Sequence, residues 1–154
     1  MVAVSLKKFF FQAEDGIRDR SRGLGIPAEP LFRSLKRALT LIGTPYRWGG
    51  SSPDSGFDCS GLVGYVFRTA LGIDLPRVSR DMAQNGERVE RASLNAGDLV
   101  FFGRRGNRID HVGIYLGEGR FVHAPRTGKD VMVSELDSGY WATRFKSGRR
   151  VAGV

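Results

Sequence analysis

The sequence contains very little cysteine and histidine, the residues that carry much of the nucleophilic, acid–base and metal chemistry of proteins. Its 154 residues include one cysteine, Cys59, and two histidines, His111 and His123. A single cysteine excludes an internal disulfide, so the cysteine count assigns no redox compartment. Three such residues also fall short of the four ligands of a structural zinc site, and the short paired spacings of zinc motifs are missing. We therefore expect neither a metal nor a cofactor.

Long apolar runs, internal repeats and low-complexity tracts are absent as well. No run of apolar residues is long enough to span a membrane. Residues 12–19 read QAEDGIRD, which resembles the translation of a common sequencing adapter. We therefore divide the chain into a leader over residues 1–25, expected to be non-native or disordered, and one domain over residues 26–154. The length of that domain suits a single core, and we expect a monomer.

Cys59 begins a stretch that has the spacing of an amphipathic helix. Apolar residues recur at intervals of three and four from Cys59 to Leu71, and Gly72 supplies a stop. Asp58 is a suitable cap, because its side chain can accept the free N–H groups of the first turn. A cysteine in that turn feels the positive end of the helix, so we expect its thiol to ionise readily. The Asp58 carboxylate opposes ionisation, and we therefore expect it to point at the backbone or at a substrate.

The two histidines lie in adjacent runs that are typical of a β-hairpin. The runs cover residues 109–116 and 120–124, and the Gly-Glu-Gly tripeptide between them suits a three-residue turn. This turn length places Gly113 opposite His123, with His111 two residues along the same strand. Because side chains alternate between faces, both histidines then project from one face as diagonal neighbours. A two-residue turn would place them on opposite faces.

The rest of the pattern places helices before strands. A helix is predicted over residues 30–42, and Ser79 is a candidate cap for a short helix ending near Gly86. Further strands are predicted over residues 99–102, 131–134 and 149–151. Helices followed by antiparallel strands indicate an α+β fold, in which the helix of the cysteine packs on the sheet that carries the histidines.

Several short motifs occur together in this chain: TPYRWGG at 44–50, FDCSGLV at 57–63, LPR at 75–77, AGDLVFF at 96–102, DHVGIY at 110–115 and FVHA at 121–124. In this order, they resemble the NlpC-type cysteine peptidases, papain-like enzymes that cut the peptide stems of bacterial peptidoglycan. The resemblance runs from about residue 31 to residue 151 and implies a papain-like core. Within the family, the chain looks most like the murein endopeptidases that open stem-peptide crosslinks.

A thiol and two imidazoles are the parts of a cysteine nucleophile, a general base and a group that orients the base. The resemblance implies these three roles for Cys59, His111 and His123, and it associates Tyr46 with the oxyanion site. The expected reaction is acyl transfer through a thioester, followed by hydrolysis. The alternative for the lone cysteine is a buried small apolar residue.

Two polar residues flank the nucleophile. By resemblance, Asp58 and Ser60 could bind polar groups of the stem peptide, but they could equally serve only as the helix cap and a first-turn residue. A thiol-dependent acyltransferase or a non-peptide amidase on the same fold would use the same chemistry up to the thioester. The sequence therefore predicts a peptidoglycan endopeptidase, with these enzymes as the alternative.

The chain is basic, with 24 Lys and Arg residues against 16 Asp and Glu residues, a formal charge of +8 and a pI near 10.2. This charge also suits a nucleic-acid-binding domain, the less favoured alternative. The arginines are scattered, however, and no nucleic-acid motif accompanies them. Peptidoglycan stems carry free carboxylates that would attract a cationic enzyme. We therefore expect these stem peptides rather than nucleic acid as the partner, and the periplasm or cell envelope of a bacterium as the location.

Overall fold

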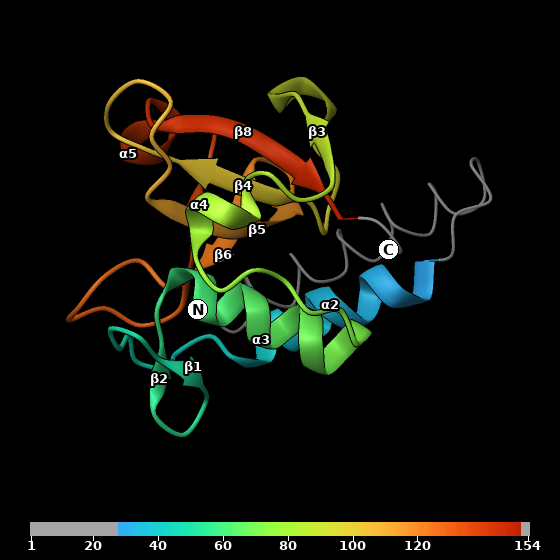
Figure 1. Cartoon of the computed structure of the whole chain (residues 1–154), viewed down its shortest axis with the longest axis vertical. Coiled ribbons are helices and arrows are strands. Elements are labelled where there is room, and N and C mark those ends of the chain that lie inside the picture. Colours follow the sequence, from blue (N-terminus) through green and yellow to red (C-terminus); the bar gives the residue numbers. More distant parts are fainter. Residues whose placement is uncertain (1–27, 152–154) are drawn as a thin grey trace.

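The computed structural model describes residues 28–151 of the chain. The leader delimited at residues 1–25, with its expected non-native or disordered character, lies outside the described residues. The two long helices lie on one side of the described part and the larger sheet on the other (Figure 1). Over the described range, no helix combines the length and the apolar character needed to cross a membrane.

Two helices pack against each other on one side of the main sheet, α2 (Ala28–Thr40) and α3 (Cys59–Leu71) (Figure 1). A small hairpin contacts α3 and consists of β1 (Ser51–Ser52) and β2 (Gly56–Phe57). Three short helical segments complete this set: α4 (Ser79–Met82), the 3-10 turn η1 (Arg91–Ser93) and α5 (Gly139–Ala142).

The main sheet has six strands in the order β3-β8-β4-β5-β6-β7, and all neighbours run antiparallel. Its strands are β3 (Glu87–Val89), β4 (Leu99–Phe102), β5 (His111–Gly117), β6 (Arg120–His123), β7 (Met132–Glu135) and β8 (Phe145–Arg150). Helix α3 contacts β5 and β6, where the two histidines lie. The predicted α+β fold, with the helix of the cysteine packed on the sheet of the histidines, is confirmed.

The sheet is buried on both faces, as β4 illustrates. Leu99 and Phe101 belong to a large core that includes residues of α2 and α3. Val100 and Phe102, which point the other way, belong to a smaller apolar cluster on the opposite face. Burial of both faces explains why this strand is an uninterrupted apolar run in the sequence.

Local signals predict some element boundaries better than others. Helix α3 and strand β4 begin and end at the predicted residues. The helix predicted over 30–42 lies two residues earlier, the strand predicted over 131–134 lies one residue later, and the segment 149–151 is the end of the longer strand β8. The prediction that Ser79 caps α4 is wrong, because Val78 holds the cap position and Ser79 is the first helical residue.

The β5–β6 hairpin reaches the predicted register by a different route. Its turn has two residues, Glu118 and Gly119, both at positive φ (55° and 73°), because Gly117 pairs with Arg120. Such a turn alone would put the histidines on opposite faces. A β-bulge between Tyr115 and Gly117 adds one residue and restores the register. The three-residue turn was therefore the wrong prediction, whereas the shared face of the histidines was the right one.

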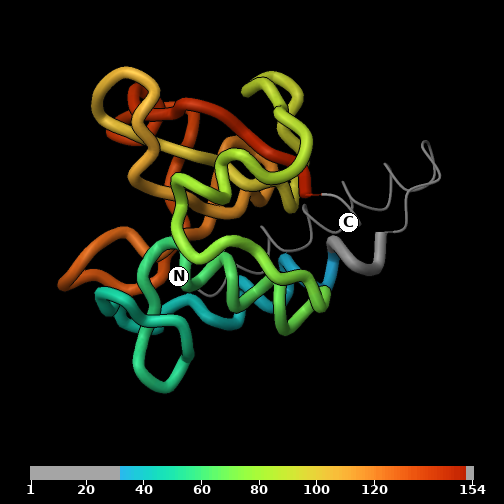
Figure 2. Tube along the Cα trace, in the orientation of Figure 1, coloured from blue at the N-terminus to red at the C-terminus, as the bar shows by residue number. Residues whose placement is uncertain are grey.

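The loop between β6 and β7 leaves the sheet and lies against the segment that precedes β1 (Figure 2). An isolated bridge joins Pro45 to Asp130, and the amide of Tyr46 donates to the carbonyl of Lys129 at 2.9 Å. This contact ties the segment that leads to Cys59 to the strands that carry the histidines.

Candidate active site

Cys59 is the first residue of α3, and the residue before it fixes the start of that helix. The Asp58 carboxylate caps the helix as predicted, accepting the amide of Gly61 at 2.7 Å. At the other end Gly72, at φ 69°, donates its amide to the last carbonyls. These caps hold the half-buried Cys59 in the first turn.

A hydrogen-bond network surrounds the Asp58 carboxylate, which points at the backbone as expected. Its Oδ2 accepts the amide of Gly49 at 3.2 Å and one Arg77 nitrogen at 2.9 Å, while its Oδ1 accepts the other Arg77 nitrogen at 3.1 Å. Arg77 also donates to Oγ of the buried Ser60 at 2.9 Å. The structure thus brings both predicted polar residues together beside the nucleophile, joined by one arginine.

Glycines allow the loop before β1 to approach α3 closely. A Cβ at Gly61 would collide with the carbonyl oxygen of Gly50, and the same carbonyl accepts the amide of Asp58 at 3.0 Å. Tyr46, in the same loop, and Cys59 both pack against the large core. Burial raises the pKa of Tyr46, and the charges of Cys59 and then Asp58 raise it further, so the phenol lies within electrostatic range of the sulfur.

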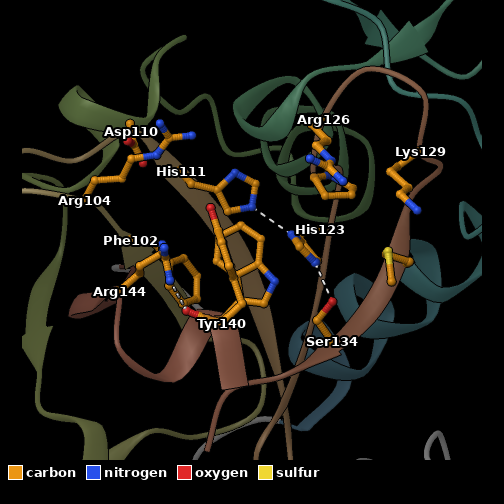
Figure 3. Close-up of a pocket in the computed structure, with 13 residues that line it drawn as sticks. Phe102, Arg104, Asp110, His111, His123, Arg126, Lys129, Ser134, Tyr140 and Arg144 are labelled. Atoms are coloured by element: carbon orange, nitrogen blue, oxygen red, sulfur yellow. Dashed lines mark hydrogen bonds between the residues drawn. The ribbon is translucent and has the colours of Figure 1, made fainter. Parts of the chain in front are cut away.

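His111 and His123 form a hydrogen-bonded chain with Ser134 on the face of the sheet that carries the smaller cluster (Figure 3). Nε2 of His111 lies 2.7 Å from Nδ1 of His123, and Nε2 of His123 lies 2.8 Å from Oγ of Ser134. A Cβ at Gly113 would lie 3.2 Å from the Cβ of His123 and 2.7 Å from the ring of Phe121. The missing side chain of Gly113 therefore leaves room for the imidazole of His123.

One set of histidine tautomers satisfies both hydrogen bonds of the His111–His123–Ser134 chain and leaves one imidazole nitrogen free to act as a base. If Nδ1 of His111 is to accept a proton, its Nε2 carries the hydrogen and donates to Nδ1 of His123. His123 then donates from Nε2 to the hydroxyl of Ser134. Within residues 28–151, Nδ1 of His111 has no hydrogen-bond partner. The arrangement can therefore provide an oriented general base with a free nitrogen.

The indole of Trp141 covers both imidazoles. It stacks on His111 with ring centroids 4.7 Å apart and planes at 22°, and it meets His123 edge-on at 5.0 Å. Phe102 and Phe121 contact the same two rings from the sheet. His111 is 6% exposed and His123 is fully buried. This enclosure fixes the planes of the rings and excludes water from them.

Burial keeps the imidazoles and the thiol neutral. It lowers the pKa of His111 to about 3 and the pKa of His123 well below its usual value, where the His111 charge adds to the effect. Burial, and then the Asp58 charge, raise the pKa of the Cys59 thiol to about 11. Backbone amides act in the opposite direction on this pKa, and that of Val112 comes first among them.

The expectation that the thiol ionises readily is therefore wrong for the free protein. Cys59 does occupy the first turn of α3, but the loss of hydration outweighs the helix end. Val112, whose amide lowers this pKa, follows His111 directly at the start of β5, and Cys59 is the first residue of α3. A thiolate would form here by proton transfer to the imidazole during a reaction rather than in advance.

The sequence of this chain matches the model of a known protein family. The NlpC/P60 family model matches residues 43–150, which include the cysteine, both histidines and the strands that carry them. The chain belongs to the NlpC/P60 family. Within the described range, no group of three or more His, Cys, Asp or Glu side chains is placed to hold a metal ion.

Individual relatives agree with this membership. The chain is 43% identical to the murein DD-endopeptidase MepH of Escherichia coli over 121 residues, which are 77% of this chain and 45% of that protein. It is 44% identical to the bifunctional muramidase/DL-endopeptidase CwlT of Bacillus subtilis over 119 residues, which are 76% of this chain and 35% of that protein. This chain therefore spans less than half the length of either relative.

A solved structure covers the same domain. The NlpC/p60 domain of the peptidoglycan hydrolase SagA superposes with a TM-score of 0.70 at 33% sequence identity. The match covers 79% of this chain and 98% of that one. The match therefore spans nearly the whole of that NlpC/p60 domain.

Sequence reasoning missed three residues of this NlpC/P60 site. Ser134 was predicted only as the end of a strand, although period-two spacing from Met132, the partner of His123, puts it on the same face. Arg77 lay in a quoted motif without a role, because 19 residues separate it from Asp58. Trp141 carried no signal, since α5 reaches the histidines only through the tertiary fold.

Proposed function

We propose that this NlpC/P60 chain is a cysteine endopeptidase that hydrolyses an amide bond in the stem peptides of bacterial peptidoglycan. The observation that supports it most is the hydrogen-bonded chain from Ser134 through His123 to His111, which leaves Nδ1 of His111 without a hydrogen-bond partner among the described residues. The substrate class is supported by relatives named as murein and peptidoglycan hydrolases.

The reaction begins with a proton transfer. Nδ1 of His111 takes the proton from Sγ of Cys59, and the sulfur forms a bond to the amide carbonyl carbon. The imidazolium then gives that proton to the leaving nitrogen, the C–N bond breaks and an amine departs. Water attacks the thioester with His111 again as base, which releases a carboxylic acid and restores the thiol.

Other residues stabilise the charges that form. The backbone N–H of Cys59, at the start of α3, and the hydroxyl of Tyr46 would donate to the oxyanion. His123 and Ser134 hold His111 in the tautomer that leaves Nδ1 free. Asp58, beyond its role as a cap, and Ser60 would present polar groups to the acyl half of the substrate. The basic charge and the proposed substrate support a location in the periplasm or cell envelope of a bacterium.

Digestion of solubilised peptidoglycan fragments tests this proposal. The full chain should release new peptides that mass spectrometry identifies, and Cys59→Ala should release none because no other thiol exists in the chain. His111→Gln should lower the rate by about 10³-fold or more while the fold persists by circular dichroism.

Two outcomes would contradict the proposal. Products that persist with Cys59→Ala would exclude cysteine chemistry, and a folded wild-type chain that releases no peptide would exclude peptidase activity. An acyl group that is trapped on Cys59 and passes to an added amine instead of water would establish the acyltransferase alternative.

A further inference from the structure

We propose that this domain has a second binding site, a cationic hollow between α4 and β8 that holds the phosphate groups of an anionic polymer without bases. None of the residues assigned to the reaction lines this hollow. The site therefore goes beyond the proposed peptidase activity. It would hold the protein on such a polymer while the catalytic residues stay free.

The hollow is formed by four parts of the fold. Helix α4, strands β3 and β8, and the loop between β4 and β5 supply the residues that line it, and its volume is about 290 Å³. The same loop borders the histidine pocket, because residues 107–109 line the hollow whereas Asp110 and His111 line the pocket. The two recesses therefore share one loop as a wall, and a polymer in the hollow lies beside the histidine pocket without entering it.

The hollow carries positive charge without a compensating acid. No Asp or Glu is among the described residues that line it, whereas five cations are: Arg80, Arg88, Arg108, Lys146 and Arg149. Arg80 and Arg88 each lie near one exposed carboxylate outside the hollow, at 3.9 and 3.5 Å, and such exposed pairs contribute little. The other three cations form no ion pair within residues 28–151.

Strand pairing brings two of these arginines together. Arg88 on β3 lies directly opposite Arg149 on β8, and like charges in that arrangement destabilise an antiparallel pair. Arg149 also pairs with Leu99, a residue of the large core, so its side chain is on the face of the sheet that packs on the helices. The buried Nε–H of Arg149 donates to no group in the described part of the chain. An anion bound between these two side chains would offset their repulsion.

A β-bulge adds the lysine to the same group. Ser147 and Phe145 pair with consecutive residues of β4, so Lys146 between them is the extra residue of the bulge. Strict alternation from Arg149 would place Lys146 on the opposite face of the sheet. Both side chains nevertheless line the hollow, because the bulge redirects Lys146.

The backbone that carries Arg108 is fixed beside the hollow. Its amide donates to the carbonyl of Arg105 at 3.2 Å, and the amide of Asp110 donates to the carbonyl of Phe102 at 2.9 Å. A Cβ at Gly103 would collide with the carbonyl oxygen of Arg108, so a glycine is needed for this close approach. The loop between β4 and β5 is thus folded back against the end of β4, which places Arg108 opposite the cations of β8.

The composition of the wall indicates phosphate as the ligand group. Four of the five cations are arginines, and a guanidinium binds phosphate with two parallel hydrogen bonds. Five positive charges exceed what one carboxylate balances, whereas a phosphodiester chain supplies one negative charge at every repeat. No Phe, Tyr or Trp is among the described residues of the wall, so the hollow lacks the rings on which bases stack. These observations favour a phosphate polymer without nucleosides over nucleic acid.

Binding of a short, fluorescently labelled poly(glycerol phosphate) chain to the full protein tests this proposal. Fluorescence anisotropy gives the Kd, and the variant Arg108→Gln/Lys146→Gln should raise it by about tenfold or more, since hydrogen bonds to charged groups are lost. Neither residue forms an ion pair among the described residues, so the substitutions leave no other charge unpaired. The slope of log Kd against log salt concentration should fall by about one for each cation removed.

A charge-matched control separates the hollow from the overall charge. The variant Lys36→Gln/Arg68→Gln also removes one lysine and one arginine, at exposed positions of α2 and α3. It should keep the wild-type Kd. An equal loss of affinity in this control, or an unchanged Kd in Arg108→Gln/Lys146→Gln, would overturn the proposal.

Two competing polymers with the same number of charges decide the chemical class of the ligand. Poly-glutamate and a single-stranded oligonucleotide should both bind more weakly than poly(glycerol phosphate). Equal or tighter binding of poly-glutamate would show that carboxylates suffice, and tighter binding of the oligonucleotide would assign the hollow to nucleic acid; either result overturns the proposal. Cys59→Ala should bind with the wild-type Kd, so the outcome is independent of whether the peptidase proposal holds.

Discussion

The two sides of the site handle charge in opposite ways. On the nucleophile side a single arginine, Arg77, is fully engaged with the Asp58 carboxylate and the Ser60 hydroxyl, directly beside Cys59. On the histidine side the imidazoles are neutral and buried. Four cations line the pocket beside them and have no ion-pair partner among the described residues: Arg104, Arg126, Lys129 and Arg144.

The charges of the nucleophile side are therefore satisfied within the fold, whereas those of the histidine side have no such ion pairs among the described residues. The nucleophile side uses its charges to fix the start of α3, so its geometry exists before any substrate arrives. The histidine side has an aromatic lining, and its four cations outnumber the single carboxylate of Asp110. The following predictions test this contrast, from the largest effect to the smallest.

The histidine side should set the acid limit of stability. Burial holds the pKa of His111 at about 3, and that of His123 well below its usual value, so the unfolded chain binds more protons than the folded chain below pH 6.5. The free energy of unfolding should therefore fall as the pH falls, by up to about 1.4 kcal/mol per pH unit for each histidine. Urea unfolding at a series of pH values measures this slope. His111→Gln should lower the number of protons taken up on unfolding by about one, and the slope should fall accordingly. An unchanged slope would contradict the prediction.

The nucleophile side should instead contribute to the alkaline limit. The pKa of Cys59 is about 11 in the folded chain against 9.0 for a free thiol, so this group favours folding below pH 9. The contribution should be lost as the pH rises through 11. The difference between the two pKa values corresponds to about 3 kcal/mol of unfolding free energy at most. Cys59→Ser provides the control, since it removes the only thiol. Identical losses of stability between these pH values in the wild type and in Cys59→Ser would contradict the assignment.

The Asp58 carboxylate combines a cap with a charge, and two substitutions separate these roles. Asp58→Ala should lower the free energy of unfolding by about 1 kcal/mol, because the amide of Gly61 loses its acceptor. Asp58→Asn keeps a capping oxygen and should cost less. Because the Asp58 charge raises the pKa of Cys59, Asp58→Asn should also shift the pH dependence of Cys59 alkylation to lower pH. Equal stabilities of the Ala and Asn variants would show that the cap contributes little.

The part of the fold that could be predicted from the sequence is the part with local causes. Helix α3 has its cap, its apolar stripe and its terminating glycine within fifteen consecutive residues, and its bounds were predicted correctly. Strand β8 was predicted only at its end, because its sequence, FKSGRR, is polar and has no alternating pattern. Its pairing with β3 on one side and β4 on the other makes it a strand.

The site divides in the same way. Cys59 and both histidines could be named from the sequence because the chain has no others of their kind. Trp141 could not, since its stacking on His111 depends on where α5 docks. The ionisation of Cys59 was predicted wrongly for a related reason: the helix end is visible in the sequence, whereas the burial that outweighs it is a property of the whole fold.

The bulge between Tyr115 and Gly117 has a consequence for how this hairpin can change in length. Because side chains alternate between the two faces of a strand, the number of residues between His111 and His123 decides whether both rings share a face. One residue more or less moves one ring to the other face. Insertions or deletions in pairs preserve the parity, and single ones do not unless a bulge appears or disappears with them. Among homologous chains, we therefore expect the spacing of these two histidines to vary in even steps, and each odd step to be accompanied by the gain or loss of a bulge.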